Sequence, residues 1–151
     1  MFSPRTRTRI PKSPMLSQTA EYALRATVWL AEHGEGPVRV GDLAHALRIP
    51  QNYLSKTMHQ LARAGVLHSV RGKHGGFRLA RQPGAIRLLD IVEPFEPLAD
   101  RKRCVLGRAV CSDAAPCQAH DRWKEVTRTT TAFFSGTTLA DLMRTKAPKA
   151  T

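Results

Sequence analysis

Acidic residues are scarce in this chain, which has 12 aspartates and glutamates against 24 lysines and arginines in 151 residues. Long hydrophobic runs are also missing, and no stretch approaches the roughly 18 uncharged residues of a membrane-spanning helix. The three cysteines are too few, and of the wrong parity, for a disulfide framework. The N-terminus lacks the apolar segment of a secretory signal. These absences exclude a membrane protein and a disulfide-stapled secreted domain, and they favour a cytoplasmic location.

Catalytic patterns are absent too. The sequence shows no Ser/His/Asp set, no paired carboxylates and no nucleotide fingerprint, so we expect no enzymatic activity. The formal charge of +12 instead indicates a polyanionic partner, with nucleic acid first. Residues 1–14 carry four basic residues, three prolines and no acid, which predicts a disordered basic arm, and Met15 is a candidate start. Removing those four residues lowers the charge only from +12 to +8, so the inference does not depend on the arm.

Helical periodicity governs the next part of the chain. Residues 17–33 form an amphipathic pattern with Ser17 as the N-cap, and Gly34 follows as a stop. A second apolar face spans 40–47, and after Pro50 a third helix is expected over 51–64, with Leu54, Met58 and Leu61 inward. Two short helices joined by a turn of about three residues make a helix-turn-helix pattern.

Two short strands are expected at 66–70 and 77–80, around the Gly-rich basic tip 71–76. This hairpin predicts the wing of a winged helix-turn-helix. Eight of the residues from Arg39 to Arg81 are lysine or arginine, against the single acid Asp42, so positive charge is concentrated on the expected DNA reader. The alternatives are an ordinary small α+β domain and a phosphate-binding loop, but the tip lacks the G-x-x-x-x-G-K-[ST] spacing of the latter.

The third helix and the tip of the hairpin supply the candidate DNA contacts. Side chains in the first turn of a reading helix reach base edges, lysine suits phosphate, and a narrow minor groove attracts arginine. The candidate residues are Gln51, Asn52, Tyr53, Ser55, Lys56, His59, Arg71, Lys73 and His74.

Beyond residue 83 the chain changes character. A short buried helix is expected within 86–92, then a loop with all three cysteines, and then helical spacing from 121 to 134. That last helix has a wide aromatic stripe, which is either part of a monomer core or a dimerisation surface. We favour dimerisation, because helix-turn-helix proteins commonly read paired half-sites. The expected interface residues are Trp123, Val126, Phe133 and Phe134.

The cysteine loop places Cys104, Cys111 and Cys117 in a polar setting, with His120 two residues beyond the last cysteine. Thiolates and imidazole form a soft ligand set that suits an iron–sulfur cluster or zinc. The plain alternative is three inert thiols, yet the surrounding loop offers little core to join. Nearby cations also favour the thiolate form.

Several motifs together resemble one bacterial family. They are Glu21-Tyr22-Ala23-Leu24-Arg25, Asn52-Tyr53-Leu54, Val70-Arg71-Gly72 with Gly75-Gly76, the three-cysteine loop, His120-Asp121-Arg122-Trp123 and Thr138-Leu139-Ala140-Asp141-Leu142. Over residues 15–143 the chain resembles the Rrf-type winged helix-turn-helix transcriptional regulators, the group that includes IscR, NsrR and CymR.

The resemblance implies a homodimeric transcription factor that binds palindromic double-stranded promoter DNA. It also implies an iron–sulfur cluster, 2Fe–2S favoured over 4Fe–4S, whose state changes promoter affinity in response to iron–sulfur supply, nitric oxide or redox state. Cys104, Cys111 and Cys117 would hold the cluster, with His120 as the fourth ligand. Glu21 of the other subunit is the rival for that position.

The expected fold is mostly α with a small β-wing and a long C-terminal dimerisation helix. Its parts are the arm 1–14, the winged helix-turn-helix domain 15–97, the cysteine loop 98–120, the dimerisation helix and C-terminal segment 121–143 and a disordered tail 144–151. Two other functions compete: a winged-helix regulator that uses zinc or reversible thiol oxidation at the same cysteines, and a basic RNA-binding protein.

Overall fold

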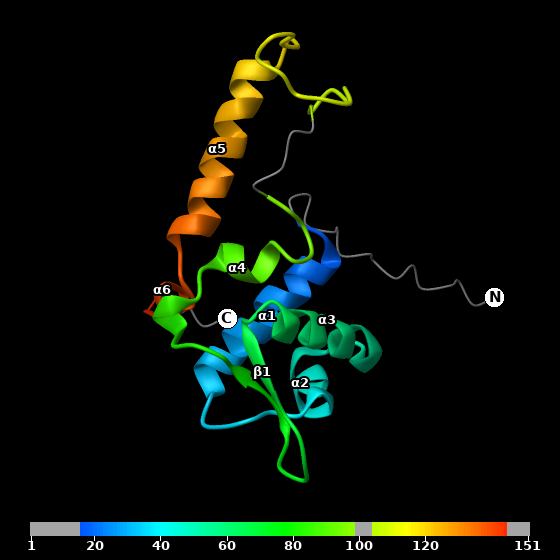
Figure 1. Cartoon of the computed structure of the whole chain (residues 1–151), viewed down its shortest axis with the longest axis vertical. Helices are drawn as coiled ribbons and strands as arrows, with labels where there is room; N and C mark the ends of the chain where they lie inside the picture. The colour runs from blue at the N-terminus through cyan, green and yellow to red at the C-terminus, as the bar shows by residue number, and fades with distance from the viewer. Residues whose placement is uncertain (1–15, 99–103, 145–151) are drawn as a thin grey trace, which may run out of the picture.

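The computed structural model describes residues 16–98 and 104–144. Its elements run α1, α2, α3, β1, β2, the 3-10 turn η1, α4, α5 and α6 in chain order (Figure 1). The fold is mostly helical with one small antiparallel sheet, as the sequence predicts. The expected arm 1–14, the candidate start at Met15 and nearly all of the expected tail lie outside the described residues.

Three helices form the helix-turn-helix unit. Helix α1 spans Gln18–His33, and Ser17 caps it by accepting from the backbone N–H of Ala20 at 3.2 Å. Helix α2 spans Val40–Leu47 and α3 spans Gln51–Arg63, so all three elements match the expectation closely. Arg48 turns the chain between α2 and α3 in the left-handed conformation. Arg25 of α1 donates to the carbonyl oxygen of Leu47 at 2.6 Å, which satisfies the exposed end of α2.

The wing consists of β1 (Leu67–Val70), β2 (Gly76–Leu79) and the turn between them. Leu67 pairs with Leu79, and Val70 pairs with Gly76. Val38 forms an isolated antiparallel bridge with Phe77, so the beginning of β2 is held against the segment before α2. A Cβ at Gly76 would lie 2.3 Å from the carbonyl oxygen of Val38, so only glycine allows this close approach.

The C-terminal elements complete the core around the helix-turn-helix unit. Helix α4 (Leu88–Val92) packs on α1, and α6 (Leu139–Arg144) packs on both α1 and η1 (Pro83–Ala85). The last part of the expected dimerisation helix and C-terminal segment, 121–143, thus packs on the body. Leu139 is fully buried there with Leu30, Leu54, Met58, Leu61, Ile86 and Ile91.

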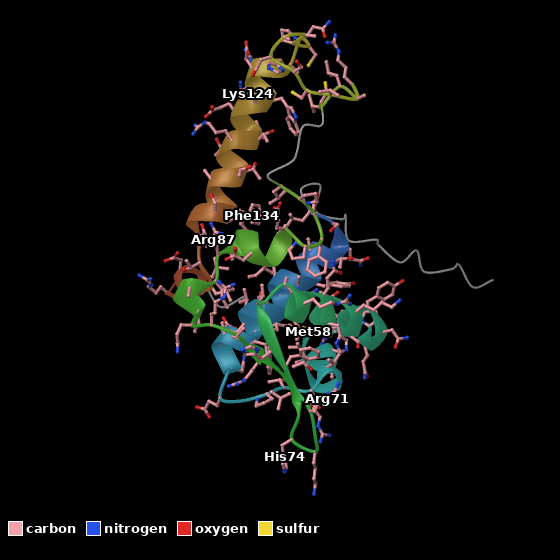
Figure 2. All side chains as sticks on the ribbon, viewed as in Figure 1. Met58, Arg71, His74, Arg87, Lys124 and Phe134 are labelled. Atoms are coloured by element: carbon pink, nitrogen blue, oxygen red, sulfur yellow. The ribbon has the colours of Figure 1, made fainter. Side chains whose placement is uncertain are left out.

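Helix α5 (His120–Gly136) projects from the body and carries the cysteine loop at its far end (Figure 1). Its C-terminal end contacts α4, where Phe134 is buried in the core (Figure 2). The ring of Phe134 is therefore covered within the protomer, whereas the other expected interface residues of α5 are not buried. Val126 and Phe133 stay about half exposed, at 50% and 53%.

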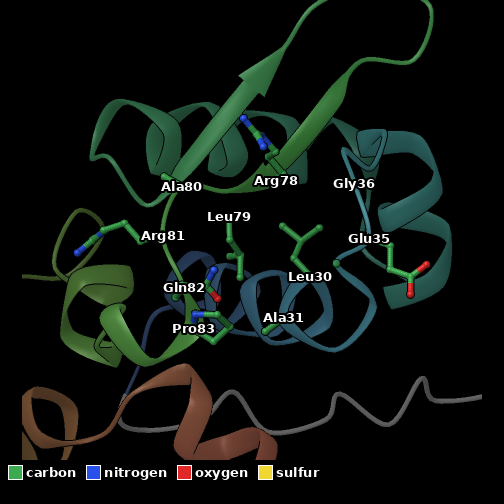
Figure 3. Close-up of a pocket in the computed structure, with 11 residues that line it drawn as sticks. Leu30, Ala31, Glu35, Gly36, Arg78, Leu79, Ala80, Arg81, Gln82 and Pro83 are labelled. Atoms are coloured by element: carbon green, nitrogen blue, oxygen red, sulfur yellow. The ribbon is translucent and has the colours of Figure 1, made fainter.

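A hollow of about 780 Å³ lies between the end of α1 and the segment after β2 (Figure 3). Leu30 and Leu79 line its floor, and Glu35, Arg78 and Arg81 stand at its edge. None of the residues that line it belongs to α3 or to the cysteine loop. No helix in the described part of the chain is long and apolar enough to cross a membrane.

Candidate DNA interface and cysteine loop

The exposed side of α3 presents the expected base-reading residues. Gln51, Asn52 and Lys56 are exposed, and Ser55 is half-buried. Tyr53 has 66% of its surface exposed, although it is a large aromatic residue with a neighbouring core to join. Leu54, Met58 and Leu61 are fully buried on the opposite side. The apolar side thus holds the helix in place and leaves a polar and basic face exposed.

The wing tip carries the other expected contacts. Arg71, Lys73 and His74 are exposed, and Figure 2 places Arg71 and His74 at the end of the molecule farthest from α5. Arg39 donates to the carbonyl oxygen of Lys73, so the residue before α2 holds the tip of the wing. Sequence reasoning missed this role of Arg39, because its partner lies 34 positions away and no local pattern connects them.

His59 is exposed like most of the other candidate contacts of α3, and it also links this helix to the wing. Its ring meets the buried ring of Phe77 edge-on, with centroids 5.2 Å apart. Gln60 also donates to the carbonyl oxygen of Pro94 at 2.8 Å, which ties α3 to the segment after α4. Helix α3 and the wing are therefore connected, and His59 contributes to their relative position.

Opposite this surface, the cysteine loop brings its four expected ligands together as two pairs. The Sγ of Cys104 lies 3.5 Å from the Sγ of Cys117, and the Sγ of Cys111 lies 3.4 Å from the Nδ1 of His120. Cys104 and His120 are buried, while Cys111 and Cys117 are partly exposed. Within the described residues, no three His, Cys, Asp or Glu side chains are close enough together to hold a single metal ion.

Asp113 orients the ring of His120. Its Oδ1 lies 2.8 Å from the Nε2 of His120 and 2.8 Å from the Nζ of Lys124. The hydrogen bonds from Lys124 and His120 lower the pKa of Asp113 to about 2, so this carboxylate is ionised and can only accept. The Nε2 of His120 must then carry the hydrogen. Neutral His120 consequently presents the lone pair of Nδ1 to Cys111.

Backbone groups act on Cys104. The N–H of Arg108 donates to its sulfur and, with a second N–H from Leu106, lowers the pKa of the thiol below its ordinary value of 9.0 despite the opposing effect of burial. The loop thus favours the thiolate that a metal or a disulfide-forming reaction requires. A small hollow of about 270 Å³ adjoins Cys111 and His120 beside Trp123.

The rival ligand Glu21 lies on α1, where its carboxylate is 3.9 Å from Arg25. Sequence reasoning missed Asp113 and Lys124, which complete the surroundings of His120. Their spacing in the sequence could have indicated this contact: Asp113 lies seven positions before the candidate ligand His120, and Lys124 lies one helical turn after it. Only the fold of the loop shows that all three side chains meet.

Known proteins show the same architecture. The Rrf2 family model, described as an iron-dependent transcriptional regulator, matches residues 16–145. The chain belongs to the Rrf2 family. A protein of Aquifex aeolicus (strain VF5) assigned to the HTH-type transcriptional regulators is 39% identical over 131 residues, covering 85% of this chain and 91% of the relative.

Two solved structures of transcriptional regulators extend the comparison. T. potens IscR superposes with a TM-score of 0.69 at 27% identity, over 88% of this chain and 92% of that one. CymR of B. subtilis, titled the global cysteine regulator, gives 0.71 at 28% identity, over 87% and 98%. This Rrf2 chain is therefore a transcriptional regulator of the winged helix-turn-helix class and not an enzyme, which confirms both predictions.

Proposed function

We propose that this Rrf2 protein is a homodimeric regulator that binds palindromic promoter DNA and senses iron–sulfur supply, nitric oxide or redox state through a cluster held by its cysteine loop. The observation that carries the proposal is the pairing of the four donor side chains, Cys104 with Cys117 and Cys111 with His120. The IscR relatives and the iron-dependent description of the family support it.

The donor set fits a 2Fe–2S cluster by its chemistry and its arrangement. Two ligands on one tetrahedral metal with bonds of about 2.3 Å lie roughly 3.8 Å apart, and the two pairs here are separated by 3.5 Å and 3.4 Å. A 2Fe–2S cluster takes two protein ligands on each iron. One iron would thus take Cys104 and Cys117, and the other would take Cys111 and His120. When bound, the cluster supplies one-electron chemistry and reactivity toward nitric oxide and oxygen.

Asp113 supports His120 as the fourth ligand. Histidine ligands of metals usually donate their second ring N–H to a carboxylate, which fixes the tautomer and the ring orientation. Asp113 accepts from the Nε2 of His120 in this way, and the Nδ1 is left facing Cys111. Glu21 lies 3.9 Å from Arg25 within the same protomer, and its role as a ligand would require the partner subunit.

The test is anaerobic purification followed by an absorption spectrum and assays for iron and acid-labile sulfide. We expect about two irons and two sulfides per chain. His120→Ala should give a labile cluster with a shifted spectrum, while Glu21→Ala should leave the lifetime of the cluster in air nearly unchanged. If Glu21→Ala loses the cluster and His120→Ala retains it, the ligand comes from the partner subunit. Bound zinc, or no metal at all, would contradict the cluster proposal.

The DNA part of the proposal is tested separately. Competition between a palindromic duplex and RNA of matched length should favour the duplex at every salt concentration used. Genomic footprinting with wild type and with Cys104→Ser would then identify the promoters and show whether the loop controls their occupancy. Preferential binding of RNA would contradict the assignment.

A further inference from the structure

The cysteine loop holds three thiols, and three different intramolecular disulfides are conceivable among them. The described contacts separate these options. Cys104 and Cys117 face each other with their sulfurs 3.5 Å apart, whereas Cys111 is engaged by the ring of His120. A disulfide needs a sulfur separation of about 2.05 Å, so only a small movement closes the first pair.

Local backbone structure holds each member of that pair in place. The N–H of Gly107 donates to the carbonyl oxygen of Cys104, and the N–H of His120 donates to that of Cys117. Each cysteine therefore begins a hydrogen-bonded turn, and the two turns bring the sulfurs together. Cys104 has only 8% of its surface exposed, while Cys117 is partly exposed, so a reagent from solution meets Cys117 first.

We propose that Cys104 and Cys117 of the cluster-free chain form a reversible disulfide that blocks the loading of the cluster, while Cys111 remains a thiol. This inference rests on the proposed function, because the blocked ligands are those of the proposed cluster. The disulfide removes one complete pair of donors and leaves Cys111 and His120 behind. In the oxidised state the cluster would not assemble at the site, and in the reduced state it would.

The oxidant class is a small organic disulfide, RSSR. The thiolate of Cys117 attacks one of its sulfurs, the S–S bond of the reagent breaks, and RS⁻ leaves with the electron pair. The thiolate of Cys104 then attacks the Sγ of Cys117, and the mixed disulfide releases the second RS⁻. Two cysteine thiols lose two electrons and two protons in total, and one RSSR becomes two RSH.

The experiment uses the full cluster-free chain, reduced under anaerobic conditions and then treated with glutathione disulfide. Trypsin cleaves after Arg103 and Arg108, and a protease that cleaves before aspartate cuts at Asp113 and Asp121. The three cysteines are then distributed over the fragments 104–108, 109–112 and 113–120. After alkylation of the remaining thiols, we expect 104–108 linked to 113–120 and an alkylated 109–112.

Thiol titration should show the loss of two of the three thiols, and a dithiol reductant should restore both. Cys111→Ser should still form the bond, whereas Cys117→Ser should not and serves as the matched control. A dominant link from Cys111 to either other cysteine, or glutathione mixed disulfides without an internal bond, would overturn the proposal.

Reconstitution with iron and sulfide separates this inference from the function on which it rests. The reduced chain should assemble the cluster, and the oxidised chain should do so only after reduction. If the oxidised chain loads as much cluster as the reduced chain, the blocking role is wrong. If the reduced chain loads none while the Cys104–Cys117 bond forms, the cluster function fails and the assignment of the bond stands without its blocking role.

Discussion

Arg71 directly follows β1 and begins the turn of the wing, and its side chain is exposed at the end of the molecule opposite the cysteine loop (Figure 2). A guanidinium at this place suits a narrow minor groove. Arg71→Ala should weaken promoter binding by about 1–3 kcal/mol, as measured by titration at fixed salt. Arg128→Ala on α5 is the control, because it removes the same charge far from the wing. Equal affinities of Arg71→Ala and wild type would show that the wing does not contact DNA.

Asn52 and Lys56 lie on the same exposed side of α3 but differ in the contact they are suited to make. An amide pairs with base edges, whereas an ammonium group acts as a point charge on phosphate. Asn52→Ala should therefore relax sequence preference among operator variants. Lys56→Ala should weaken binding to all sequences alike and make the slope of log affinity against log salt shallower by roughly one. The reverse result in the two variants would exchange their roles.

At the scale of elements, α4 depends on a charged contact at its start. The carboxylate of Asp90 accepts from the backbone N–H of Arg87 at 3.0 Å and from its guanidinium at 2.8 Å. Burial alone would raise the pKa of Asp90, but the hydrogen bonds and charge of Arg87 outweigh it and lower the pKa below 3.8. The resulting stabilisation is fully present above the unfolded-state pKa and is lost as pH falls through the folded-state pKa.

Asp90→Asn should consequently lower the Tm most at neutral pH, and the difference from wild type should shrink below about pH 4. Thermal unfolding followed by circular dichroism over this range measures it. Glu125→Gln is a comparison variant, since Glu125 makes a similar pair with Arg128 on a more exposed surface and should matter less. A difference between Asp90→Asn and wild type that stays constant with pH would refute the explanation.

Local signals in the sequence predict most of the elements because their causes are local. Ser17 and Gly34 directly flank α1, Pro50 directly precedes α3, and apolar spacing identifies the buried faces. The burial of Phe134 could not be predicted from the sequence, because an aromatic stripe has the same spacing whether it meets a partner or its own core. The association of α6 with α1 links residues more than 100 positions apart, which no local pattern reports.

The candidate site also has features that the sequence predicts and features that depend on the fold. The residue types of the loop predict a ligand set, and the composition of the tip predicts a basic wing. The pairing of Cys104 with Cys117, and the position of Asp113 behind His120, depend on how the loop closes in space. The contact of Arg39 with the wing likewise needs the hairpin to fold back beside α2.

At the scale of the whole molecule, we propose that the exposed side of α5 forms the dimer interface. Val126 and Phe133 are seven positions apart and therefore lie on one helical face. Val126→Asp should convert the dimer to a monomer in sedimentation experiments and reduce operator affinity, because single half-sites would then be bound independently. Arg128→Asp introduces an acid on the other side of the helix and should leave the dimer intact. A stable monomeric wild type at micromolar concentration would contradict the dimer.

The cysteine loop lies at one end of α5, and the other end is anchored in the body. A small tilt of the helix would therefore move the loop over a larger distance. The 17 residues of α5 extend about 25 Å, and the pivot is the contact of Phe134 with the body. A tilt of about 10° at the pivot would sweep the tip through roughly 4 Å over that length. In a dimer held together along these helices, ordering or loosening of the two tips would alter the span between the two reading helices. In the proposed dimer, that span would have to match half-sites about 34 Å apart, so a change at the cysteine loop would alter how well the two helices fit the DNA.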